Sequence, residues 1–174
     1  MDKTMKVTVD GIELEVKISE EELAKLTKGK EPKKTGYERV DCSQEYCVVG
    51  SDGRVECLNE LGDAYDDDYY KTANYYTDVT LAENNARADK LMHQLRRFAA
   101  ENCEEVKWDG VSGTPRYAIV YDYTDCMLST WFFSSTDARN FGQIYFDTKE
   151  NARKAIDIFK CELIWYFTEY RDRA

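Results

Sequence analysis

The sequence is poor in the groups that most enzymes use. Its 174 residues include a single histidine, His93, so any Ser-His or Cys-His chemistry would have to use this residue of a predicted helix. None of the six cysteines belongs to a C-x-x-C pair, which excludes the common zinc motifs. The chain has no Walker loop and no G-x-G-x-x-G segment. We therefore expect no catalysis, no metal and no cofactor, with a metal-dependent or thiol enzyme as the alternative.

The chain also has no apolar run of the roughly 18 residues that a membrane span requires. Its first residues, MDKTMKVTVDG, lack the apolar segment of a signal peptide. We therefore expect a cytoplasmic protein that makes no membrane contact. Because thiols stay reduced in the cytosol, we expect free cysteines, although Cys47 and Cys57 could also face each other across a hairpin.

Basic residues are too few to balance the acids. The net charge is −10 at pH 7, which disfavours nonspecific binding to nucleic-acid backbones. It favours, as a partner, a basic protein surface or a site that normally holds nucleic acid. The excess is local, because residues 37–78 contain eleven acids and three bases. The chain also contains thirteen tyrosines, a residue type that is enriched at binding interfaces.

Acidic residues and tyrosines are both concentrated in residues 60–72, ELGDAYDDDYYKT. The three consecutive aspartates do not match an EF-hand loop, which needs alternating acids and a central glycine, so only a weak Ca²⁺ or Mg²⁺ site is left open. One interpretation is a flexible acidic segment that imitates DNA and binds a basic groove. The other is a solubilising connection between a hairpin and a helix. The candidate partner-binding residues are Glu60, Asp63, Tyr65, Asp66, Asp67, Asp68, Tyr69 and Tyr70. Replacing Asp66, Asp67 and Asp68 by asparagine is expected to weaken partner binding with little loss of fold stability.

The N-terminal residues are predicted to form a small unit of their own. Asp10-Gly11 lies between two alternating segments and is a strong signal for a hairpin turn. Ser19 can cap the helix that follows. This pattern predicts a ββα unit over residues 1–27, followed by a Lys-rich linker over residues 28–36.

The remaining residues, 37–174, are predicted to form an α+β domain in which antiparallel sheets are covered by two long helices. Residues 37–103 and 114–174 have the same expected order of elements, namely a hairpin, a connection, a short aromatic strand and a helix. Duplication and convergence both explain this order.

Local signals place these elements. Apolar stripes at three- and four-residue spacing predict the two helices. Thr77 or Asp78 can cap the first helix, and Asp147 or Thr148 the second. The β-branched and aromatic segments YAIVYDY and GQIYF are predicted to be central strands.

The first long helix carries four basic residues: Arg87, Lys90, Arg96 and Arg97. A solvated helix face is one interpretation of this group. The other is a small cationic surface that contacts phosphate, DNA or an acidic partner.

Three segments carry a resemblance to known proteins: YYTDVTLAENNARADKLMHQLRRFAAEN, RYAIVYDY and FGQIYFDTKENARKAIDIFKCELIWYFTEY. Together they resemble a group of small accessory proteins carried by phages and prophages of Gram-positive gut bacteria. The resemblance covers roughly residues 45–174, and the segment VTVDGIELEVKISEEELAKL is similar to an addition seen in such phage proteins. Some of these proteins resemble anti-CRISPR inhibitors of Cas9-type nucleases.

The resemblance implies an inhibitor that acts without catalysis in the cytoplasm of a bacterial host cell. It would bind a Cas9-type effector with its guide RNA and block DNA targeting or cleavage. The shared motifs are structural, so the resemblance assigns no site residues. The alternative is a phage accessory module that binds another host protein or a nucleic-acid-handling complex.

Overall fold

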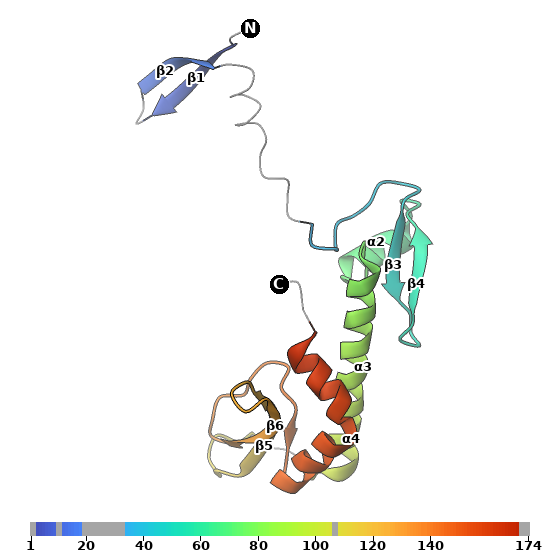
Figure 1. Cartoon of the computed structure of the whole chain (residues 1–174), viewed down its shortest axis with the longest axis vertical. Helices are drawn as coiled ribbons and strands as arrows, with labels where there is room; N and C mark the ends of the chain where they lie inside the picture. The colour runs from blue at the N-terminus through green and yellow to red at the C-terminus, as the bar shows by residue number, and fades with distance from the viewer. Residues whose placement is uncertain (1–2, 10–11, 19–33, 106–107, 171–174) are drawn as a thin grey trace. The chain divides into compact units, whose positions relative to one another are not determined.

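The computed structural model of the chain (Figure 1) describes residues 3–9, 12–18, 34–105 and 108–170. It divides into two compact units, Met1–Thr35 and Gly36–Ala174.

The first unit contains an antiparallel pair of strands, β1 (Lys3–Val9) and β2 (Ile12–Ile18). Their register pairs Val9 with Ile12, as expected for the alternating segments around Asp10-Gly11. The turn residues themselves lie outside the described residues. The helix predicted after Ser19, and most of the predicted linker, lie outside them as well.

The second unit has an α+β fold with antiparallel sheets. The strands β3 and β4 form a two-stranded sheet, and β5, β6 and β7 form a three-stranded sheet in the order β6-β5-β7. Three helices occur among the described residues. In chain order the elements are β3 (Glu45–Val49), β4 (Val55–Asn59), α2 (Ala64–Lys71), α3 (Val79–Asn102), β5 (Pro115–Asp122), β6 (Met127–Ser134), β7 (Tyr145–Phe146) and α4 (Lys149–Thr168).

Helix α3 connects the two parts of this unit, as Figure 1 shows. Its 24 residues give a length of about 36 Å. The first turns pack Leu81 and Ala82 against Cys47 of β3, whereas later turns pack Leu91 and Leu95 against α4 and the three-stranded sheet. We call residues 36–86 the hairpin lobe and the described residues of 87–170 the sheet lobe.

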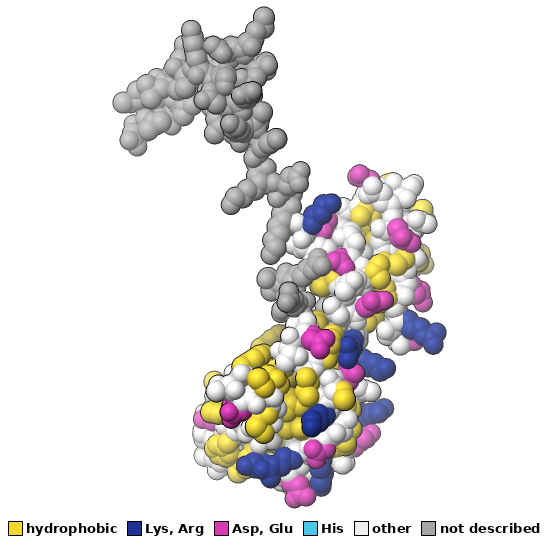
Figure 2. Space-filling view, in the orientation of Figure 1, with side chains coloured by type: hydrophobic (Ala, Val, Ile, Leu, Met, Phe, Trp, Pro, Cys, Tyr) yellow, Lys and Arg dark blue, Asp and Glu magenta, His cyan; other side chains and the backbone are white. Residues whose placement is uncertain are grey.

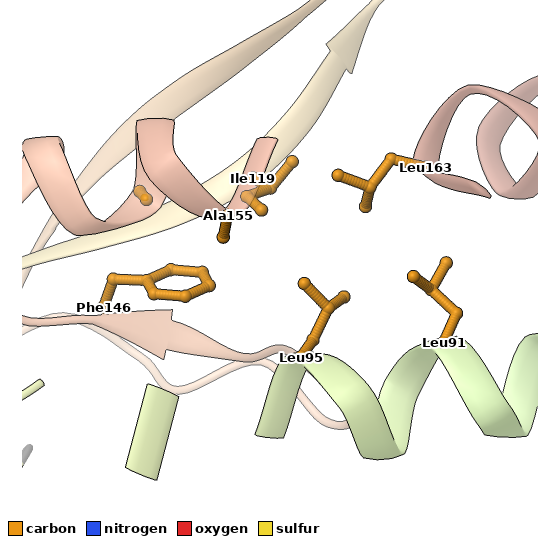
Figure 3. Close-up of a cluster of buried hydrophobic side chains, with 7 residues drawn as sticks. Leu91, Leu95, Ile119, Phe146, Ala155 and Leu163 are labelled. Carbon is orange, nitrogen blue, oxygen red and sulfur yellow. The ribbon is translucent and has the colours of Figure 1, made fainter. Parts of the chain in front are cut away.

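The core of the sheet lobe lies where α3, α4, β5 and β7 meet (Figure 3). The buried side chains in this cluster are Leu91, Leu95, Ile119, Phe146, Ala152, Ala155 and Leu163. Helix α4 packs along all three strands, while α3 packs mainly on α4 and on the β3–β4 hairpin. The expectation that two long helices cover the antiparallel sheets is therefore only partly correct.

The predicted central strands have different positions in the sheet. Strand β5 is central, as predicted, with β6 on one side and β7 on the other. Strand β7 is an edge strand of two residues, so the prediction of a central strand at GQIYF is wrong. Its apolar pattern reflects burial instead, since Tyr145 and Phe146 are only 6% and 1% exposed.

The two lobes share part of their order, namely a hairpin, a short antiparallel pairing and a helix, but α2 of the hairpin lobe has no counterpart among the described residues of the sheet lobe. In the hairpin lobe, Tyr76 forms an antiparallel bridge to Cys47 of β3 just before α3 begins. In the sheet lobe, β7 pairs antiparallel with β5 just before α4 begins. Asp78 caps α3 and Thr148 caps α4, each through a side-chain oxygen that accepts a backbone N–H of the first turn.

The expectation of free cysteines is wrong for one pair. Cys47 and Cys57 lie directly opposite each other in the β3–β4 register, 4.1 Å apart between Cα atoms, and form a disulfide. The backbone of Cys47 exchanges both hydrogen bonds with Tyr76 on its other side, which makes Cys47–Cys57 a non-hydrogen-bonded pair. Side chains approach most closely at such pairs. The free cysteines of the described residues are Cys42, Cys103, Cys126 and Cys161.

Candidate functional site

Most of the acidic stretch is helix α2, not a flexible loop. Asp63 caps α2, and its Oδ1 accepts the backbone N–H groups of Tyr65 at 2.8 Å and Asp66 at 3.1 Å. Asp66 reaches back, because its Oδ2 accepts the backbone N–H of Asp63 at 3.2 Å. This reciprocal capping box satisfies donors that a helix start would otherwise leave unpaired. The expectation of a flexible segment is therefore wrong here.

Asp66 is the buried residue on the inner side of this helix. Its Oδ1 accepts the hydroxyl of Tyr46 at 2.5 Å, and its Oδ2 accepts the backbone N–H of Leu61 at 2.8 Å. The Tyr46 hydroxyl, together with the backbone donors, lowers the pKa of Asp66 to about 2. Burial, together with the Asp66 carboxylate, raises the pKa of Tyr46 well above its ordinary value. Asp66 is therefore charged at neutral pH, and both of its carboxylate oxygens accept hydrogen bonds from inside the protein.

Glu60 is a second buried carboxylate, with only 2% of its surface exposed. Its oxygens accept a hydrogen bond from Nη2 of Arg39 at 2.9 Å and another from the hydroxyl of Tyr75 at 2.7 Å. The Arg39 guanidinium lowers the pKa of Glu60. Burial, together with Glu60, raises the pKa of Tyr75 to about 12. Glu60 and Asp66 therefore cannot contact a partner, which corrects the expectation for these two residues.

Stacked rings join the two carboxylate sites. The rings of Tyr46 and Tyr75 lie 3.9 Å apart between centroids, with 10° between their planes. Each of these tyrosines donates its hydroxyl to one of the two buried carboxylates. We call Arg39, Tyr46, Glu60, Asp66 and Tyr75 the tyrosine–carboxylate network. It holds α2 against β3 and the segment before α3, so much of the acid and tyrosine content of this region has a structural role.

The remaining candidates divide into supporting and exposed residues. Asp67 forms an ion pair with Arg39 at 2.6 Å, and Tyr69 packs its ring against Tyr46. Tyr70 is 44% exposed and places its ring edge-on to Tyr75.

The outer side of α2 and the residues just before it present an acidic and aromatic surface. Leu61 and Tyr65 are 71% and 76% exposed, and Asp63 and Asp68 are exposed beside them in sequence. We call Leu61, Asp63, Tyr65 and Asp68 the α2 face. In Figure 2, acidic side chains are spread over the hairpin lobe and few basic ones accompany them. Of the predicted site residues, a partner can therefore reach Asp63, Tyr65 and Asp68 on the α2 face, and Tyr70 beside them in sequence.

The basic residues of α3 do not form one surface. Arg87 binds both carboxylate oxygens of Glu162, at 2.7 and 3.1 Å, and its guanidinium lies 3.9 Å from the centroid of the buried Trp165 ring. Arg87 therefore ties α3 to α4, which corrects its assignment to a free cationic surface. Arg97 pairs with Glu101 one turn later, at 3.8 Å.

Lys90 and Arg96 make no ion pair with other described residues. At about 100° per residue, Arg96 projects roughly opposite to Arg87 on the helix. It lines a cavity with residues that come from two loops of the sheet lobe.

The described residues contain no group of three or more His, Cys, Asp or Glu side chains placed to hold a metal ion. His93 is exposed on α3. Among the helices that the structure describes, none has the length and apolar character needed to cross a membrane. Comparison with protein-family models, curated proteins and solved structures found no match to the chain.

Sequence reasoning missed Arg39 and the cavity beside Arg96. Arg39 is one of only three bases in the acidic residues 37–78, and this is the local signal of its pairing role. Arg139 and Trp108 lie in separate loops, 31 residues apart, and no spacing pattern links them to Arg96.

Proposed function

We propose that the protein is a non-catalytic inhibitor that binds a guide-loaded Cas9-type CRISPR effector and blocks its use of target DNA. The α2 face carries this proposal, because it places exposed carboxylates and an exposed ring on a rigid support in the most acidic part of the chain. Cas9-type effectors hold nucleic acid in positively charged channels and read the PAM with arginines. An acidic lobe is complementary to such surfaces.

The rigid support matters for affinity. A helix of eight residues is too short to be stable alone in water. The capping box and the tyrosine–carboxylate network fix it in the folded protein, so a partner does not have to order it. Binding to a preorganised element loses less conformational entropy than binding to a flexible segment.

The chemistry of the α2 face matches arginine. Asp68 offers an exposed carboxylate, and Tyr65 offers a ring with an exposed fraction of 76%. A guanidinium can pair with the carboxylate and stack on the ring. Tyrosine is also among the residue types that contribute most energy at protein interfaces. We therefore assign the contact to Asp68 and Tyr65, with Asp63 retained mainly as the helix cap.

Size-exclusion chromatography with guide-loaded Cas9, run beside a DNA-cleavage assay, tests the proposal. The wild-type protein should co-elute with the effector and reduce cleavage. The double variant Asp68→Lys/Tyr65→Ala should bind at least about tenfold more weakly, the effect of losing a central interface residue.

The matched control is Asp157→Lys/Ile158→Ala on α4. It makes the same charge change, and it also removes one exposed large side chain, since Ile158 is 62% exposed. This control should bind like the wild type. Absence of co-elution together with unchanged cleavage would refute the proposed function. If both double variants weakened effector binding equally, the α2 face would not be the contact surface.

A further inference from the structure

The sheet lobe contains a cavity of about 780 Å³ that plays no part in the proposed function. It opens between the second half of α3 and the loop that precedes β7. Its volume lies within the range of small-molecule sites, roughly 300–1,000 Å³. Arg96 of α3 and Arg139 of the loop both line it.

The cavity is cationic in a protein that carries a net charge of −10. Both arginines are exposed, and neither makes an ion pair with other residues that the structure describes. None of the described residues that line the cavity is acidic. Two guanidinium groups on one cavity, without a neutralising carboxylate, favour an anion that accepts several hydrogen bonds. A phosphate group has this chemistry.

Aromatic rings form another part of the same cavity. Trp108 is partly buried and packs edge-on to Tyr145, with 4.8 Å between ring centroids. The Tyr145 hydroxyl accepts the backbone N–H of Asn140 at 3.0 Å, which anchors the loop that carries Arg139. Phe141, in this loop, is fully exposed and also lines the cavity. The cavity therefore combines a ring held by the core with a ring presented to solvent.

We propose that this cavity binds a nucleotide, either free or as a unit of single-stranded nucleic acid. Arg96 and Arg139 pair with the phosphate, and the base stacks on Trp108, with Phe141 on the same cavity. Stacking on aromatic side chains tolerates every base, so this site has little sequence preference. The inference is independent of the effector proposal, since the cavity and the α2 face lie in different lobes.

Fluorescence anisotropy with a labelled twelve-residue oligodeoxythymidylate, run beside titration with unlabelled dTMP, tests the inference on the full chain. Arg96→Glu and Arg139→Glu should each weaken oligonucleotide binding by about tenfold and lower the slope of log affinity against log salt by about 1. Arg97→Glu is the matched control, because Arg97 is the next residue on the helix and does not line the cavity. It should change the affinity by less than about twofold.

Tryptophan fluorescence supplies the second readout. Bound nucleotide should quench part of the emission in the wild type, and this quenching should be lost in Trp108→Phe, which keeps an aromatic ring beside Tyr145. Similar affinities per site for dTMP and the oligonucleotide identify a free nucleotide as the ligand, and tighter binding of the oligonucleotide identifies a strand. Absence of binding of both probes overturns the inference. So does an equal effect of Arg97→Glu, or quenching that persists in Trp108→Phe.

Discussion

The hydroxyl of Tyr46 is the part of the tyrosine–carboxylate network that can be removed with the least change of shape. Phenylalanine at this position keeps the ring that stacks on Tyr75 at 3.9 Å. It deletes only the donor that reaches Asp66 at 2.5 Å. Because Tyr46 is 1% exposed, water does not readily replace this donor.

The expected loss of stability follows from the remaining contacts of Asp66. Its other oxygen still accepts the backbone N–H groups of Leu61 and Asp63, at 2.8 and 3.2 Å. Removing a buried hydroxyl that donates to a charged group costs about 1.5–3 kcal/mol. With a urea m-value of about 2 kcal/mol/M, Tyr46→Phe should lower the urea midpoint by about 1 M.

A second readout separates this hydrogen bond from a general packing defect. The Tyr46 hydroxyl is the largest cause of the low Asp66 pKa, so that pKa should rise from about 2 toward its ordinary value of 3.8 in Tyr46→Phe. NMR titration of the side-chain carboxyl carbon measures this directly. A pKa of Asp66 that does not move in the variant would refute the assignment of the network.

The matched control is Tyr65→Phe. It removes the same atom from a tyrosine that is 76% exposed on the α2 face. Its urea midpoint should change by no more than the equivalent of about 0.5 kcal/mol. A control that loses as much stability as Tyr46→Phe would show that the hydroxyl effect does not come from burial.

Three further changes test other parts of the structure. Stability should fall as the pH drops from about 4 to about 2, and urea midpoints at pH 6, 4 and 3 would show this. Asp66 and Glu60 have pKa values in the folded protein below their ordinary values of 3.8 and 4.5. Their charged forms therefore stabilise the fold above the ordinary values, and this stabilisation is lost on acidification. Leu95→Ala should cost about 2–5 kcal/mol by opening a cavity in the sheet-lobe core, whereas a loss below about 1 kcal/mol in chemical denaturation would contradict the packing. Thiol titration of the unreduced, denatured protein should find four thiols, and six thiols before reduction would rule out the disulfide. Reduction of Cys47–Cys57 should lower the free energy of unfolding by about 3 kcal/mol, given the separation of 10 residues between the two cysteines.

The helices and hairpins could be predicted because their signals are local. Asp78 and Thr148 act as caps through oxygens that reach only three residues along the chain. The stripe of α3 that contains Leu91 and Leu95 indicates its buried side from spacing alone. The position of β7 could not be found in this way, since a short apolar segment has the same pattern at the edge of a sheet as at its centre.

The burial of Glu60 and Asp66 was not predictable from the stretch that contains them. A run of carboxylates is normally exposed to water, because burying an unpaired charge is costly. The donors that make burial possible are Arg39, Tyr46 and Tyr75, and the fold alone brings these three to the same place. The disulfide depends on the register that places Cys47 opposite Cys57, and the residues around the hairpin do not fix this register, because the turn could pair either cysteine with a neighbouring position.

The division of the acidic stretch into internal and external carboxylates changes how its function can be tested. The sequence alone predicts little loss of stability when Asp66, Asp67 and Asp68 are replaced together by asparagine. This prediction is wrong, because Asp66 is buried in the network and Asp67 pairs with Arg39. Such a variant would lose structure and partner contact at once, so weaker binding could not be assigned to either cause. Asp68→Lys avoids this ambiguity, because Asp68 is exposed and its side chain makes no ion pair with other described residues. A binding defect in that variant with an unchanged urea midpoint would locate the contact on the α2 face, whereas normal binding would leave the charge of this stretch with a structural role alone.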